Sequence, residues 1–79
     1  MDGDDRDVKL EAAASLFDSA ADELDLAGAH ARMAAERFRV GDVGQATSHA
    51  WAALGYVRTG EDILVAQARE HRRPPDAVG

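Results

Sequence analysis

Arg39-Val-Gly-Asp-Val-Gly-Gln45 is the stretch that decides the fold of this chain. Two glycines bracket Asp42, and Gln45 stands three residues after that aspartate. Glycine favours the end of a helix, whereas aspartate followed three residues later by glutamine favours the start of the next one. The sequence therefore predicts a turn formed by Gly41, Asp42, Gly44 and Gln45, with a helix on each side.

Before the turn, apolar residues recur at alternating steps of three and four between Leu10 and Phe38. This spacing is typical of a coiled-coil seam, in which the a and d positions of each heptad face another helix. With Leu10 at position a, every d position is alanine and the e positions are alanine or Gly28. The large residues expected in this seam are Leu10, Phe17, Leu24 and Phe38. We expect one long helix over residues 5–39, capped by Asp4, Asp5 or Asp7.

After the turn, the same alternation predicts a second helix over residues 43–72. Its seam is expected to contain Ala46, Ala50, Val57 and Leu64. Basic residues at positions 69 to 73 suit the negative end of a helix, and Pro74-Pro75 then prevents its continuation. An antiparallel arrangement would bring the acidic start of the first helix near the basic end of the second, and His49 near Glu36.

The predicted fold class is all-α: an antiparallel helical hairpin that dimerises into a four-helix bundle. Residues 1–79 form one helical domain in this prediction, with disordered tails at residues 1–4 and 74–79. A second interpretation stays open, because Gly28 and Gly60 lie within the predicted helices and glycine weakens a helix interior. Breaks near these two glycines would give three or four short helices.

The length and composition favour association with another protein chain. A core of 79 residues rarely supplies more than about 3 to 5 kcal/mol without a disulfide, a metal or a partner, and the chain has no cysteine. We therefore expect a homodimer or small homo-oligomer. The formal net charge of -6 opposes binding to nucleic acid or to an anionic membrane. No apolar run is long enough to span a bilayer, so a cytoplasmic location is expected.

The residues that carry chemistry lack the spacing of a known site. The three histidines are not arranged as His-x-x-x-His, Glu-x-x-His or His-Glu-x-x-His. Asp18, Asp22 and Asp25 fall on the outer face of the first helix, where no cleft would separate their pKa values. The serines lack an activating histidine and acid. We expect no catalytic residue, no metal and no cofactor; an enzyme or metal protein would require His49 to be organised with Glu36 or His30.

A second apolar surface lies away from the predicted seams. Projected at about 100 degrees per residue, Trp51 falls outside the seam of the second helix, and Met33 falls opposite that of the first. An exposed tryptophan beside a methionine is typical of an interface, although shorter helices would instead place Trp51 in a core. The interaction residues predicted from this surface are Trp51, Met33, Leu26, Gly55, Arg58 and Tyr56.

Two families share features with this sequence. Over residues 34–54, the small and turn residues Ala34, Gly41-Asp42, Ala46 and Ala53-Leu54 resemble a single tetratricopeptide-type helical hairpin. Phe38 stands one place late for that pattern, and Arg58 occupies the place of its closing proline. The resemblance implies hairpin packing and protein binding, since one unit cannot form a repeat array.

The whole chain also resembles the small acidic, alanine-rich hairpins exported by type VII secretion systems. It lacks their Trp-x-Gly at the turn, and Tyr56 is not followed by the spacing of their C-terminal Tyr-x-x-x-Asp/Glu motif. This resemblance implies export without a cleavable signal peptide. The leading hypothesis is a non-enzymatic adaptor, scaffold or regulatory partner, and the alternative is a secreted hairpin, alone or as a heterodimer with the product of a neighbouring gene.

Overall fold

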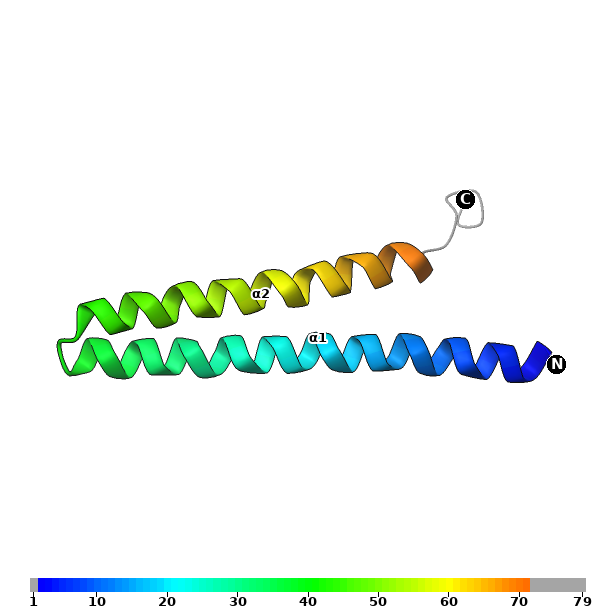
Figure 1. Cartoon of the computed structure of the whole chain (residues 1–79), viewed down its shortest axis with the longest axis horizontal. Helices are drawn as coiled ribbons and strands as arrows, with labels where there is room; N and C mark the ends of the chain where they lie inside the picture. The colour runs from blue at the N-terminus through cyan, green and yellow to red at the C-terminus, as the bar shows by residue number, and fades with distance from the viewer. Residues whose placement is uncertain (1, 72–79) are drawn as a thin grey trace, which may run out of the picture.

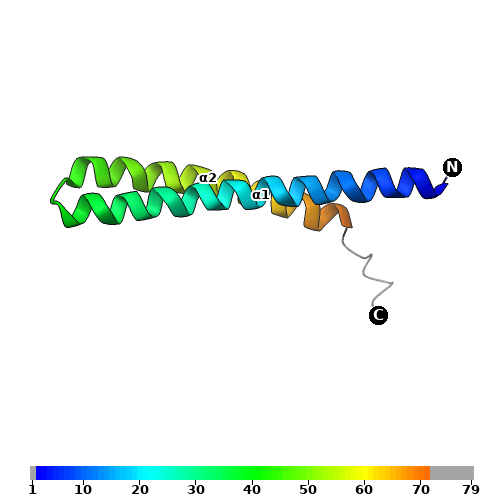
Figure 2. The same ribbon diagram turned by 90° about the horizontal axis from the view of Figure 1, so that it is seen from below.

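The computed structural model is an all-α antiparallel helical hairpin (Figure 1). It describes the backbone of residues 2–71 and the side chains of residues 5–71. Helix α1 covers Asp2–Arg39 and helix α2 covers Val43–His71. The helices lie closest near the turn and diverge toward their other ends (Figure 1). They also cross at a shallow angle, so that α2 passes from one side of α1 to the other (Figure 2).

The turn matches the predicted combination of a stop and a start signal. Gly41 has a φ of 81°, a left-handed conformation that other residues adopt at an energetic cost. The Asp42 Oδ1 atom accepts a hydrogen bond of 3.1 Å from the backbone N–H of Gln45, which satisfies one of the free donors at the start of α2. The left-handed backbone of Gly41 ends α1, and the Asp42 side chain caps α2, so that only three residues separate the two helices.

Both helices run without interruption through their internal glycines, where breaks would have given short helices. Gly28 lies inside α1 and Gly60 inside α2, so the interpretation with three or four short helices is wrong. A glycine costs only about 1 kcal/mol relative to alanine in a helix interior, and the surrounding alanines and packing outweigh this cost.

The predicted start of the first helix needs a correction. Helix α1 begins at Asp2 instead of Asp5, so Asp4, Asp5 and Asp7 lie inside it and none is its cap. The helix therefore includes the backbone of residues 2–4, which were predicted to belong to a disordered tail. The end predicted at residue 72 and the tail at 74–79 lie outside the described residues.

The line of contact between the helices consists of small residues. On α1 it follows the d positions of the predicted seam, and on α2 it includes Ala46 and Gly60. A β-carbon added to Gly60 would lie 3.2 Å from the Leu24 side chain and 3.4 Å from the carbonyl oxygen of Ala20, so glycine is what permits this close approach. The buried hydrophobic residues among those described are all alanines: Ala20, Ala27, Ala34 and Ala46.

The large residues of the predicted seam lie beside this contact line. They stay between 36% and 56% exposed: Leu10, Phe17, Leu24, Phe38, Val57 and Leu64. Ala50 is exposed as well. In a helix, a residue three places before a contact position is rotated about 60 degrees to one side of it. The helices approach at the small residues because only these allow their backbones to come close, and the bulky residues are displaced to the flank.

Candidate interaction surface

The hairpin has two sides that differ in chemistry. Residues three places after a contact residue such as Ala27 or Ala46 project to one side of the hairpin. Residues three places before it project to the other side. Because the helices are antiparallel, corresponding rows of α1 and α2 share a side. We call the first the histidine side, after His30, His49 and Tyr56. The second is the apolar side, which consists of Leu10, Phe17, Leu24, Phe38, Val43, Val57 and Leu64.

Three rings connect the helices on the histidine side. The Nδ1 atoms of His30 and His49 lie 2.9 Å apart, and both residues are partly buried. The His30 ring also stacks on that of Tyr56, with centroids 5.4 Å apart and an angle of 16° between planes. These contacts confirm an antiparallel register close to the predicted one, although the ring that His49 contacts is His30 and the predicted register placed His49 near Glu36.

The two imidazoles are positioned for a hydrogen bond between their Nδ1 atoms. Their centroids are 5.2 Å apart, and this exceeds the Nδ1 separation of 2.9 Å by about two ring radii. The two nitrogens therefore point directly at each other along one line, as in a hydrogen bond from a protonated Nδ1 to an unprotonated one. A metal ion would need about 2.0 to 2.1 Å from each nitrogen and does not fit between them in this orientation.

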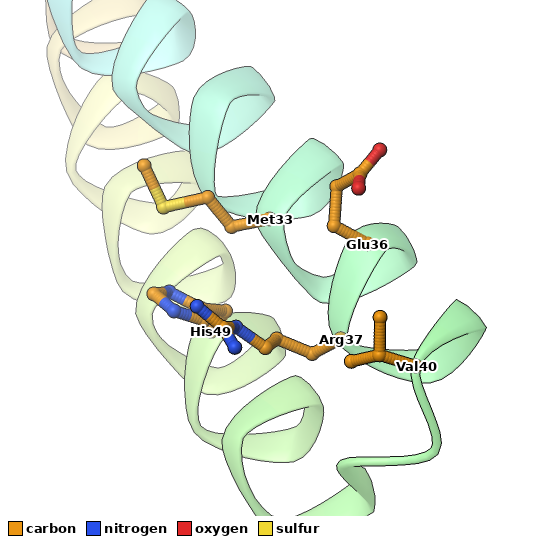
Figure 3. Close-up of a pocket in the computed structure, with 5 residues that line it drawn as sticks. All are labelled: Met33, Glu36, Arg37, Val40 and His49. Carbon is orange, nitrogen blue, oxygen red and sulfur yellow. The ribbon is translucent and has the colours of Figure 1, made fainter.

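A shallow hollow near the turn lies next to this pair. It is lined by Met33, Glu36, Arg37, Val40 and His49 (Figure 3). Glu36 and His49 thus share a hollow, as the predicted register implied, but the hydrogen-bond partner of Glu36 is Arg39, at 3.2 Å. Within the part of the chain that the structure describes, no three histidine, aspartate or glutamate side chains gather as a metal site would require.

The predicted interaction residues divide between different surfaces. Met33 lies on the histidine side near His49, and Tyr56 is half-buried against His30. Trp51 is 67% exposed and follows His49 by two residues, which turns it about 200 degrees away from that ring. The predicted patch that joined Met33 to Trp51 is therefore not one continuous surface.

The remaining residues of that set are also exposed but separated. Leu26 is 44% exposed and precedes the contact residue Ala27 by one place, which directs it toward the histidine side. Gly55 lines a hollow together with Tyr56 and Glu23. Arg58 is exposed on the outer face of α2, seven residues after Trp51 and therefore in the same row.

The apolar side is exposed, although its large residues were predicted to lie in the seams between the helices. Phe17 is 45% exposed and Phe38 is 56% exposed. Single exposed apolar residues are normal on protein surfaces, but a contiguous row on two adjacent helices is typical of an interface. In the sequence of α1, this apolar side is indicated by the contrast between the small d residues and the mostly large a residues.

Comparisons with protein-family models, curated proteins and solved structures give no match to this chain. The resemblances to a tetratricopeptide-type hairpin and to type VII substrates stay predictions. In the described residues, neither helix has an apolar stretch long enough to cross a lipid bilayer.

Proposed function

We propose that this protein is a non-enzymatic protein-protein interaction module, which associates with a second copy through its apolar side to form a four-helix bundle. In this role it acts as an adaptor, scaffold or regulatory partner. The observation that carries the proposal is the division of apolar residues: the residues that the hairpin buries are alanines, and most of its large apolar side chains stay exposed.

The energetics of the hairpin support this proposal. Burying a leucine or phenylalanine side chain contributes about 1.5 to 3 kcal/mol, whereas alanine has only one methyl group to bury. The isolated hairpin therefore gains little from its own contact line. Covering Leu10, Phe17, Leu24 and Phe38 with another helical pair provides a core of the size that a four-helix bundle normally has.

Light scattering combined with size-exclusion chromatography tests self-association directly. We expect twice the monomer mass of 8.4 kDa at micromolar concentration. Phe17→Glu should convert the dimer to a monomer, because it would place two charges in the new core. Leu16→Glu is the matched control: Leu16 is 41% exposed, but it projects to the histidine side, and the dimer should persist.

A stable, fully helical monomer of the unaltered chain at tens of micromolar would overturn the proposal. Equal effects of Phe17→Glu and Leu16→Glu on the mass would also contradict it, since association would not then depend on the apolar side.

A second candidate function is that of an exported hairpin. It is favoured by the two uninterrupted antiparallel helices, the architecture that the type VII resemblance implies. Expression in cells with an active type VII system, followed by assay of the medium, tests it. Retention of the chain inside those cells would exclude this candidate and leave the interaction module unaffected.

A further inference from the structure

We infer that the second copy packs antiparallel on the apolar side, about a two-fold axis that passes beside Gly28 of α1 and Leu54 of α2. This inference rests on the proposed self-association and specifies its geometry. In the resulting bundle, α1 lies against α1 of the second copy and α2 against α2, so that all neighbouring helices run in opposite directions. Rows of charged and aromatic residues on both helices support this arrangement.

A row of charged residues borders the apolar side of α1, one place after each a position. It contains Glu11, Asp18, Asp25, Arg32 and Arg39, with acids in its first part and bases in its second. Among the described side chains, Asp18, Asp25 and Arg32 form no ion pair within the chain, whereas Arg39 pairs with Glu36. The row therefore has unused charges of both signs next to an uncovered apolar surface.

A two-fold axis makes this row complementary to itself. In a symmetric interface, residue i of one copy contacts residue j of the other, and j contacts i. With the axis midway between Asp25 and Arg32, each Asp25 faces Arg32 of the second copy, and each Asp18 faces Arg39. A parallel pairing would place acid against acid and base against base, which is unfavourable.

Gly28 lies where this axis passes α1. A β-carbon added there meets nothing within 4 Å in the hairpin, so intramolecular packing does not require glycine, unlike at Gly60. Glycine nevertheless costs about 1 kcal/mol relative to alanine. In the proposed dimer, Gly28 faces its own copy at the closest point of the two helices. Ala21 then faces Ala35, and Leu24 faces the small Ala31.

A row on helix α2 is compatible with the same axis. Trp51 and Arg58 are seven residues apart in one row, so a two-fold axis at Leu54 places each Trp51 ring beside Arg58 of the second copy. Arginine over a tryptophan face is a favourable cation–π pair. The exposed Trp51 ring is then covered by the guanidinium group of Arg58 from the second copy.

The pairing of α1 with α2 in the hairpin places Gly28 and Leu54, the two residues beside the axis, at the same level along the helices. His30 lies level with His49 and Tyr56. Because the helices are antiparallel, moving two residues back on α1 corresponds to moving two residues forward on α2. Gly28 therefore lies level with the span from Trp51 to Arg58, whose centre is Leu54. One axis thus satisfies the rows on both helices.

Cysteine cross-linking tests the axis, because the chain has no cysteine of its own. We expect oxidised Gly28→Cys to form a disulfide-linked dimer, since a residue on a two-fold axis meets its own copy. Ser15→Cys, on the outer face of α1, is the control and should stay unlinked. A mixture of Ala21→Cys and Ala35→Cys chains should link to each other, whereas each variant alone should link poorly.

Charge exchange provides a second measurement without cysteine. Asp25→Arg alone and Arg32→Asp alone should each weaken dimerisation about tenfold, because each creates two symmetric like-charge contacts. The chain with both substitutions should regain the dissociation constant of the unaltered chain. Circular dichroism should show the same helix content in all of these variants.

The outcomes distinguish this inference from the proposed function. A dimer in which Gly28→Cys and the Ala21→Cys and Ala35→Cys mixture stay unlinked would overturn the axis but leave self-association standing. Failure of the double exchange to restore the dimer would also overturn it. A folded monomer at all concentrations would overturn both.

Discussion

At the scale of single residues, glycine has different roles at different positions of the same hairpin. Gly60 lies between the helices, where a β-carbon would contact Leu24 at 3.2 Å. Gly60→Leu should lower the free energy of unfolding by about 2 kcal/mol, because a large side chain there overpacks the contact line. Chemical denaturation monitored by circular dichroism measures this change.

Gly55→Leu provides the matched control for that substitution. It introduces the same side chain into the same helix, but an added β-carbon at Gly55 meets nothing within 4 Å. The free energy of unfolding should not fall, and the better helix propensity of leucine should raise it slightly. A similar loss in both variants would show that the Gly60 contact does not control the packing.

At the scale of the secondary-structure elements, the start of α2 depends on the Asp42 cap. Asp42→Ala removes the acceptor for the Gln45 N–H and should lower the free energy of unfolding by about 1 kcal/mol. Asp42→Asn keeps an oxygen in the same place and should retain most of the stability. Thermal unfolding at one fixed protein concentration measures both variants, and an Asp42→Asn chain as unstable as Asp42→Ala would contradict the capping role.

The two helices and their turn were predictable because their signals are local. Gly41, Asp42 and Gln45 act within a few residues of one another, and a three-four repeat over several turns indicates a helix regardless of its partner. The row that faces the other helix was harder to predict. In α2, one row of residues at seven-residue spacing begins at His49 and another begins at Ala50. Hydrophobicity favours the second row as the one that faces α1. The helices instead meet along Ala46, Ala53 and Gly60, and the side-chain contacts beside this line are made by His49 and Tyr56.

The candidate interaction surface was predictable only in part, for a related reason. Trp51 was expected outside the seam of α2 and is exposed. The exposure of Phe17 and Leu24 depends on how closely the helices approach, which small residues on both helices determine together. The contrast between small d residues and large a residues in α1 is therefore informative only together with the small residues of α2.

At the scale of the whole molecule, Trp51 reports on association. It is the only tryptophan in the chain, and it is exposed in the single hairpin but covered in the proposed dimer. Its fluorescence emission should shift to longer wavelength when the protein is diluted below its dissociation constant. Trp51→Ala should weaken dimerisation by about 2 kcal/mol, as for other interface anchors, whereas Trp51→Phe should retain part of the affinity.

Analytical ultracentrifugation of these variants gives the dissociation constants. An emission spectrum that is independent of concentration, together with unchanged dimerisation of Trp51→Ala, would exclude Trp51 from the interface.

The alanine contact line also affects when conformational entropy is lost. Alanine has no side-chain rotamers to restrict, whereas fixing a leucine costs about 0.5 to 1 kcal/mol. The two helices can therefore pair while Leu10, Phe17, Leu24 and Phe38 still sample their rotamers. In the proposed dimer, most of the side-chain ordering is then postponed until the second copy covers these residues, so that hairpin formation and the fixing of its large side chains are separate events.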